Sequence, residues 1–281
     1  MKMTAAGFAK RKQEGRRITE LTAYDYTTAA LVERAGLDAI LVGDSLGMTM
    51  LGYRDTLPVT LEDMIRHSAA VARACENAMV IMDLPFLTYQ ASPEQALLSA
   101  GRLMKEGGGQ AVKLEGGAAV APQIRALTQA GIPVQAHIGM TPQSVNVFGG
   151  FTVQGKGEAV ARRLLEDARA VEQAGAFSVV LECVPPRLAA LITRKLTIPT
   201  IGIGAGAGCD GQVLVYQDML GMGGGTPPRF VKQYAALGDA MVEAFTRYKD
   251  EVTGGAFPTD AHTYPKADCA DEVLAQLDAA F

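Results

Sequence analysis

The sequence is poor in the residues that build disulfide frameworks and zinc clusters. It contains four cysteines and three histidines in 281 residues, and the cysteines lie far apart, at positions 75, 183, 209 and 269. No CxxC pair occurs, and no cysteine lies at metal-site spacing from a histidine. The common types of zinc site are therefore excluded, and we expect the cysteines to be reduced thiols.

Long apolar runs and a strong net charge are also lacking. No apolar stretch approaches the roughly 18 residues that span a bilayer, and the first thirty residues contain no apolar segment typical of a signal peptide. The formal charge of −4 gives no electrostatic reason to expect a nucleic acid or an anionic membrane as partner. These absences predict a soluble, cytoplasmic protein.

A basic cluster near the start of the chain is interrupted by Glu14, and we interpret it as a solvated face. It comprises Lys10, Arg11, Lys12, Arg16 and Arg17.

Short apolar runs are abundant. Hydrophobic residues make up 48% of the chain and charged residues 20%, which is the balance of a globular domain. The runs recur at roughly the period of a strand, a helix and two loops, and they show no polar alternation, as expected of strands buried on both faces. We predict strands over residues 18–23, 39–44, 78–83, 111–116, 133–139, 177–184, 199–206 and 212–219.

Helix signals separate these runs. Thr60 and Asp63 have the spacing of a capping box, and Ser92 followed by Pro93 marks the start of another helix, which the glycines at 107–109 end. The pattern of apolar residues predicts further helices over residues 157–174, 230–248 and 271–281.

Eight alternating strand and helix units in about 250 residues predict an α/β fold, a single (β/α)8 or TIM barrel. An open doubly wound sheet is the alternative, but such a sheet rarely reaches eight parallel strands. We expect residues 1–253 to form the barrel and residues 254–281 a C-terminal extension. Residues 45–59 and 140–156 follow the second and fifth strands, exceed the usual loop length of about 2 to 6 residues, and are candidate lids.

Polar side chains end the second to sixth predicted strands. They are Asp44, Asp83, Glu115, His137 and Glu182. Lys113 lies two residues before Glu115 and therefore points to the same side of its strand. Because the carboxyl ends of parallel strands share one face of a barrel, we expect these side chains to share one pocket.

Carboxylates gathered in a small cavity repel one another, and a divalent cation is their natural neutraliser. Oxygen ligands with no cysteine and little histidine select Mg²⁺ over zinc. We expect Asp44 and Asp83 to bind the metal directly and Glu115 to bind it directly or through water. The alternative is that each acid only caps the helix that follows its strand.

The other candidates each have two interpretations. Lys113 suits an anionic substrate group or is a structural lysine, and His137 is either a donor in the active site or a core histidine. Glu182 lies in VVLECVPP, where apolar neighbours disfavour its charged form, as a general base requires. Its alternative is an ion pair with Arg187 or Lys195. The glycine-rich stretch 202–208 is assigned no ligand.

Several long blocks of the chain resemble the ketopantoate hydroxymethyltransferase (3-methyl-2-oxobutanoate hydroxymethyltransferase) family. In order, they are AYDYTTA, LVGDSLGM, TLPVTLEDM, MDLPF, VKLEGG, HIGMTPQSVN, GGFTVQGK, LECVP and GIGAGAGCDGQ. They lie within roughly residues 15–262. The block FPTDAHTYP departs from the usual ending of the family, and residues 265–281 extend past it.

The resemblance implies a (β/α)8 barrel, usually a homodecamer, that transfers a hydroxymethyl group from 5,10-methylenetetrahydrofolate to 3-methyl-2-oxobutanoate. The product, 2-dehydropantoate, leads to pantothenate and coenzyme A. The resemblance places the Mg²⁺ ligands on Asp44, Asp83 and Glu115, the substrate contacts on Asp44, Ser45, Asp83 and Lys113, and the proton acceptor on Glu182. In this chemistry Mg²⁺ chelates the 2-oxo acid and stabilises its enolate.

Two other functions fit the same residues. A Mg²⁺-dependent carbon–carbon lyase of 2-oxo acids, or an enzyme of phosphoenolpyruvate type, would share the barrel, the metal and the enolate but would need no folate donor. A non-catalytic barrel that binds a small acid would hold only a structural ion and would not exchange the C3 proton.

Overall fold

The computed structural model describes residues 2–150, 154–155, 157–223, 225, 227–264 and 269–281. Eight parallel strands close into a barrel in chain order, and β8 pairs with β1. The strands are Ile18–Thr22 (β1), Ala39–Val42 (β2), Met79–Asp83 (β3), Ala111–Glu115 (β4), Val134–Gly139 (β5), Ser178–Glu182 (β6), Thr200–Ile203 (β7) and Gly211–Leu214 (β8). The predicted TIM barrel is confirmed.

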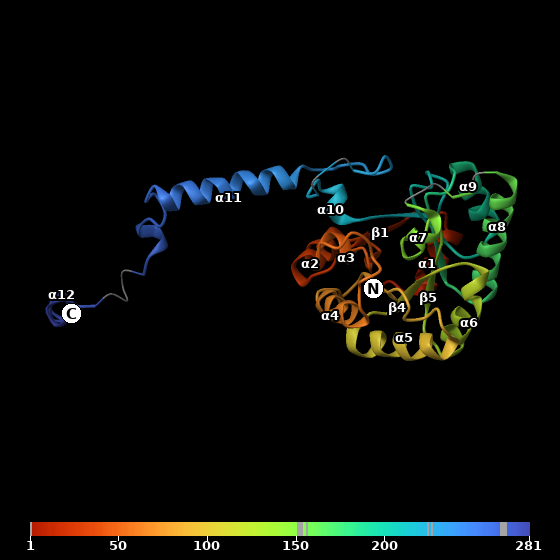
Figure 1. Ribbon diagram of the computed structural model, residues 1–281, viewed down its shortest axis with the longest axis horizontal. Coiled ribbons are helices and arrows are strands. Elements are labelled where there is room, and N and C mark those ends of the chain that lie inside the picture. Colours follow the sequence, from red (N-terminus) through yellow and green to blue (C-terminus); the bar gives the residue numbers. More distant parts are fainter. Residues whose placement is uncertain (1, 151–153, 156, 224, 226, 265–268) are drawn as a thin grey trace.

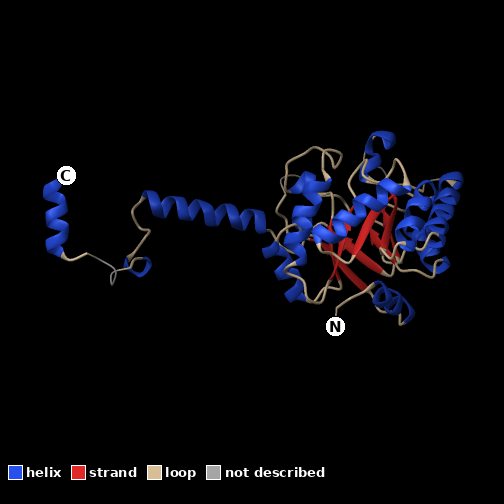
Figure 2. Ribbon diagram, turned by 90° about the horizontal axis from the view of Figure 1, so that it is seen from below, coloured by secondary structure: helices blue, strands red, loops and turns tan. Residues whose placement is uncertain are grey.

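Helices surround the strands (Figure 2). The α-helices are Ala5–Gln13 (α1), Tyr26–Ala35 (α2), Leu46–Thr49 (α3), Leu61–Ala72 (α4), Pro93–Gly107 (α5), Ala121–Gln129 (α6), Val145–Phe148 (α7), Glu158–Gln173 (α8), Pro186–Lys195 (α9), Tyr216–Met219 (α10), Leu237–Thr253 (α11) and Asp271–Ala280 (α12). Three short 3₁₀ turns cover Ala118–Val120 (η1), Pro142–Ser144 (η2) and Asp260–His262 (η3).

Local sequence signals explain where several helices begin. Thr60 and Asp63 form the predicted capping box at the start of α4, and the Ser92 side chain accepts a hydrogen bond from Gln95 N–H at the start of α5. The predicted terminal helix is confirmed as α12. The predicted strand 212–219 was too long: β8 ends at Leu214, and residues 216–219 form α10.

The apolar core has two layers. One fills the space between the strands and the surrounding helices, and the other fills the inside of the barrel. The inner layer comprises Phe8, Ile18, Ala39, Leu41, Met79, Ile81, Ala111, Val180, Ile201 and Val213. Because Phe8 comes from α1 and packs against the first residues of several strands, α1 closes the amino end of the barrel.

Two basic residues of α1 hold this helix in place. Arg11 forms an ion pair with Asp38. Lys12 Nζ donates to Asp210 Oδ2 at 2.9 Å and to the backbone oxygen of Thr193 at 2.8 Å, and the Lys12 side chain is only 15% exposed. The interpretation of the basic cluster as a solvated face is therefore wrong for Arg11 and Lys12, because Asp38 and Asp210, directly before β2 and β8, pair with them.

Helix α11 extends away from the barrel (Figure 1). It begins later than the predicted helix 230–248, after Pro227 and Pro228, and none of its residues is buried. The predicted barrel limits of 1–253 and the extension of 254–281 stay a prediction, and α11 falls inside the first of these ranges although it lies off the barrel.

Two further observations concern the chain as a whole. Cys75, Cys183 and Cys209 are free thiols, as predicted. In the part of the chain that the structure describes, no helix combines the length and the apolar composition that crossing a membrane requires.

Candidate active site

The strand register brings the predicted site residues to one end of the barrel. Asp83 at the end of β3 is level with Lys113 on β4. Glu115 at the end of β4 is level with His137 on β5. Glu182 ends β6 beside the last residue of β5. With Asp44, which lies two residues after the end of β2, five neighbouring strands supply one polar cluster, as the sequence predicts.

Asp44, Asp83 and Lys113 form the first half of this cluster, and all three are buried. The backbone N–H of Asp44 donates to Asp83 Oδ2 at 3.0 Å, and Lys113 Nζ donates to Asp83 Oδ1. Burial and the neighbouring carboxylates raise the pKa of Asp44 well above its ordinary value. Burial alone would lower the pKa of Lys113, but the carboxylates around it outweigh burial and raise it. A cationic lysine therefore already offsets part of the negative charge.

His137 joins the two glutamates of the second half. Its Nδ1 lies 3.4 Å from Glu115 Oε1, and its Nε2 lies 3.3 Å from Glu182 Oε2. These are ion-pair distances, and neither ring nitrogen makes a well-formed hydrogen bond within the described residues. Burial lowers the pKa of His137, but the two carboxylates outweigh it and raise the pKa to about 9. The imidazolium thus links Glu115 to Glu182.

Glu182 differs from the other acids because its side chain is 15% exposed. Its ion-pair partner within the described residues is His137, and not Arg187 or Lys195. Close packing holds this strand end: Gly139 has φ +100°, and a Cβ there would lie 2.3 Å from the carbonyl oxygen of Glu182. Glu182 therefore combines a restrained backbone with a carboxylate that solvent still reaches.

The two long loops lie beside the cluster, since Ser45 follows Asp44 in the chain and Gln143 of the second loop donates to Asp44. Ser45 opens the first loop, directly before α3, and its Oγ lies 2.8 Å from the hydroxyl of Tyr24. The second loop contains η2 and α7, and its residues 151–153 and 156 lie outside the described residues. The role of these loops as lids stays a prediction.

Sequence reasoning missed two residues that contact the proposed metal ligands. Gln143 donates to Asp44 Oδ2 at 2.8 Å, and the hydroxyl of Tyr89 accepts from the backbone N–H of Glu115 at 3.1 Å. Neither residue type signals a metal site in a sequence. The unusual length of the loop that carries Gln143 and its place in the block HIGMTPQSVN were the sequence signals that could have pointed to it.

The sequence profile of the family described as ketopantoate hydroxymethyltransferase matches residues 2–260 of this chain. A 3-methyl-2-oxobutanoate hydroxymethyltransferase of Clostridium novyi is 59% identical over 94% of this chain and 96% of its own length. One of Enterococcus faecalis is 56% identical over 99% of this chain and 100% of its own. The chain belongs to the ketopantoate hydroxymethyltransferase family. It is therefore an enzyme of the transferase class, as the sequence blocks imply.

Solved structures of more distant proteins share the fold of this ketopantoate hydroxymethyltransferase family member. A phosphonopyruvate hydrolase in complex with oxalate and Mg²⁺ superposes with a TM-score of 0.61 at 13% identity, covering 99% of this chain and 95% of its own. A 2,3-dimethylmalate lyase of the PEP mutase/isocitrate lyase superfamily gives 0.60 at 17% identity, with 99% and 100% covered. At such low identity these matches support the barrel alone.

The donor atoms of the cluster suit a hard divalent cation. Asp44, Asp83 and Glu115 are buried carboxylates, and Glu115 Oε1 makes no hydrogen bond with any described residue. In the described ranges, however, no three acidic, histidine or cysteine side chains already surround a common point at metal distance. The residue types fit the ion, and binding would require their side chains to move.

A further buried acid lies inside the barrel, below the polar cluster. Glu20 on β1 is 3% exposed, and its Oε2 accepts from Gln135 Nε2 at 3.1 Å, while Oε1 makes no hydrogen bond with any described residue. Burial raises the pKa of Glu20 to about 7, although the hydrogen bond from Gln135 opposes the shift. The sequence analysis did not single out Glu20, because this residue lies within a predicted strand and not at its end.

This raised pKa predicts a pH-dependent stability. Between the unperturbed pKa of 4.5 and about 7, folded Glu20 holds a proton that the unfolded chain has lost, so the free energy of unfolding falls as pH rises and then levels off above pH 7. We expect Glu20→Gln to raise the free energy of unfolding at pH 8 by up to about 3 kcal/mol and to have little effect at pH 4.5. Urea denaturation at both pH values measures this, with exposed Glu76→Gln as the control. The same gain at both pH values would contradict it.

Proposed function

We propose that this chain transfers a hydroxymethyl group from 5,10-methylenetetrahydrofolate to 3-methyl-2-oxobutanoate, giving 2-dehydropantoate for pantothenate and coenzyme A synthesis. The names of its relatives support this substrate. One observation carries the proposal: a buried carboxylate cluster with Lys113 and the partly exposed Glu182 lie at the same end of the barrel. His137 connects the two, because it contacts both Glu115 and Glu182.

Mg²⁺ is the proposed metal, held by Asp44, Asp83 and Glu115. When bound, it supplies Lewis-acid chemistry at the keto oxygen of the 2-oxo acid. Lys113 and the hydroxyl of Ser45 bind the anionic end of the substrate, since Lys113 is held cationic by its neighbours. Together with Asp44 and Asp83, these two residues form the proposed substrate-binding set.

Glu182 is the proposed proton acceptor. It takes the proton from C3 of 3-methyl-2-oxobutanoate, and this carbon forms the new bond to the one-carbon unit. Both bonds from that unit to the folate nitrogens break, water supplies the hydroxyl oxygen, and tetrahydrofolate leaves. The imidazolium of His137 faces Glu182 and orients the carboxylate that must accept the proton. Because His137 also touches Glu115, it ties the position of the base to the position of the metal ligands.

The experiment that tests this function is hydrogen exchange at C3 of 3-methyl-2-oxobutanoate in D₂O. We expect the enzyme to exchange the C3 proton with Mg²⁺ and to stop when EDTA removes the metal, while product forms only when 5,10-methylenetetrahydrofolate is added. Proton NMR follows the loss of the C3 signal and the collapse of the methyl doublet. Cleavage of a 2-oxo acid without folate would instead support the lyase, and no exchange would support a non-catalytic barrel.

The assembly is proposed to be a homo-oligomer, and the homodecamer that the family resemblance implies stays a prediction. Helix α11 carries a stripe of apolar side chains on one face, each at least 40% exposed. The stripe comprises Leu237, Met241, Phe245, Tyr248 and Val252. A stripe of this kind needs a partner surface.

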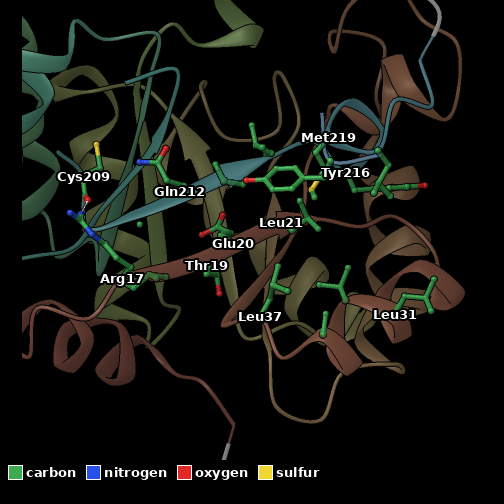
Figure 3. Close-up of a pocket in the computed structure, with 18 of the residues that line it drawn as sticks. Arg17, Thr19, Glu20, Leu21, Leu31, Leu37, Cys209, Gln212, Tyr216 and Met219 are labelled. Atoms are coloured by element: carbon green, nitrogen blue, oxygen red, sulfur yellow. Dashed lines mark hydrogen bonds between the residues drawn. The ribbon is translucent and has the colours of Figure 1, made fainter. Parts of the chain in front are cut away.

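The barrel offers such a surface. A groove of about 860 Å³ runs along the outside of the wall between α2 and the strands β1 and β8 (Figure 3). Its walls include Leu21, Leu31, Leu37, Leu214 and Leu220. A helix after β8 would normally cover this part of a barrel. We therefore expect α11 of one copy to fill the groove of another.

The cytoplasmic location stays a prediction.

A further inference from the structure

Gln143 has an unusually complete set of hydrogen bonds. It lies in η2, is only 5% exposed, and its Nε2 donates to Asp44 Oδ2 at 2.8 Å and to the backbone oxygen of Leu84 at 2.9 Å. Its Oε1 accepts from the hydroxyl of Tyr89 at 2.8 Å and from Gln90 Nε2 at 3.1 Å. These four bonds use every position of the amide, so they fix which end faces the carboxylate.

The backbone of the same residue reaches a second proposed metal ligand. Gln143 N–H donates to Glu115 Oε2 at 2.9 Å. One residue therefore holds one oxygen of Asp44 and one oxygen of Glu115. The opposite oxygen of Glu115, Oε1, is buried and makes no hydrogen bond within the described residues. It faces the His137 ring at an ion-pair distance of 3.4 Å, and without a hydrogen bond it keeps acceptor capacity for a metal ion.

Tyr89 supports this arrangement from the other side. Its hydroxyl accepts from the backbone N–H of Glu115 at 3.1 Å and donates to Gln143 Oε1. The side chain is 1% exposed, so the hydroxyl has no competing contact with bulk water. Tyr89 and Gln143 together connect the end of β4 to the loop after β5.

We propose that Gln143 is a positioning residue for the divalent cation, an inference that rests on the proposed function. By bonding Oδ2 of Asp44 and Oε2 of Glu115, it limits how far the two carboxylates move as they close on the ion, and it leaves the other oxygen of each for the ion. Groups that hold metal ligands in this way raise metal affinity. Because Gln143 lies in the loop that follows β5, binding of the ion also stabilises that loop.

The test is Mn²⁺ affinity, measured by electron paramagnetic resonance with Mg²⁺ as competitor. Gln143→Met preserves side-chain length and the backbone bond to Glu115 but removes the donor to Asp44, and we expect about 10- to 100-fold weaker binding. Gln123→Met is the matched control, since Gln123 is also a buried glutamine but contacts no proposed ligand. We expect it to bind Mn²⁺ as the parent does.

Two further readouts separate positioning from general damage. Saturating Mg²⁺ should restore C3 exchange in Gln143→Met, because the defect lies in metal affinity. Amide hydrogen exchange over residues 143–150 should slow with Mg²⁺ in the parent and not in the variant. If Gln143→Met fails to fold, Tyr89→Phe removes a single hydroxyl from the same network and should weaken Mn²⁺ binding by a smaller factor.

The outcomes distinguish this inference from the proposed function. If Gln143→Met binds Mn²⁺ as tightly as the parent, the inference is overturned; where that variant does not fold, the same result for Tyr89→Phe overturns it. The proposed function would still stand if the parent exchanges the C3 proton. A parent that binds no Mn²⁺ and exchanges no C3 proton would overturn both.

Discussion

Glu182→Gln is expected to slow Mg²⁺-dependent exchange at C3 of 3-methyl-2-oxobutanoate by about 10²- to 10⁴-fold. The substitution keeps the shape of the side chain and a polar contact with His137, but an amide cannot accept the proton. Among the acids of the described cluster, Glu182 alone combines position and freedom, because Lys113 engages Asp83 and Gln143 engages both Asp44 and Glu115. Proton NMR in D₂O at saturating Mg²⁺ measures the exchange rate in parent and variant.

Metal binding serves as the control for this variant. Glu182 is not a proposed ligand, so Mn²⁺ should bind Glu182→Gln with nearly the parent affinity, and the thermal unfolding midpoint should change little. Equal exchange rates in parent and variant would remove Glu182 from its role. Slow exchange together with lost metal affinity would instead assign Glu182 to the metal site.

Phe245→Asp is expected to convert the oligomer into smaller species. Phe245 lies in the middle of the apolar stripe of α11 and is 62% exposed in the single chain. Placing a carboxylate inside the apolar groove between α2 and β8 would bury an unpaired charge, which costs several kcal/mol and exceeds what one side-chain contact contributes. Size-exclusion chromatography with light scattering gives the mass of parent and variant.

Thr246→Asp provides the matched control. It adds the same charge one residue later, about 100° further around the helix, where Thr246 is exposed and outside the stripe. We expect this variant to keep the mass of the parent. A Phe245→Asp protein of unchanged mass would show that the stripe is not the contact, and a monomeric parent would refute the homo-oligomer itself.

The fold and the polar cluster followed from local patterns. Uninterrupted apolar runs predict strands buried on both faces, and eight of them with intervening helices leave few architectures besides the closed barrel. Since parallel strands all end at the same face of a barrel, the polar residues that end these runs are expected to lie together at that face. Asp44, Asp83, Glu115, His137 and Glu182 could be placed together on this ground alone.

The rest of the site could not be predicted from the sequence, because it depends on the conformation of the loops. Gln143 is a neutral residue in a long loop, and its importance depends on four partners from other segments. Nothing in the local sequence predicts how η2 folds back over β2 and β4. The same holds for Glu20 and Gln135, whose contact spans the inside of the barrel from β1 to β5.

The sequence by itself determined the number of strands, the order of the barrel and the face on which the acids gather, because these depend on the period of short segments. Only the tertiary structure decided that Lys12 is held at the base of the barrel, that His137 joins Glu115 to Glu182, and that α11 leaves the wall it would otherwise cover. Such contacts depend on side chains that are distant in the chain, and no local pattern encodes their separation in space.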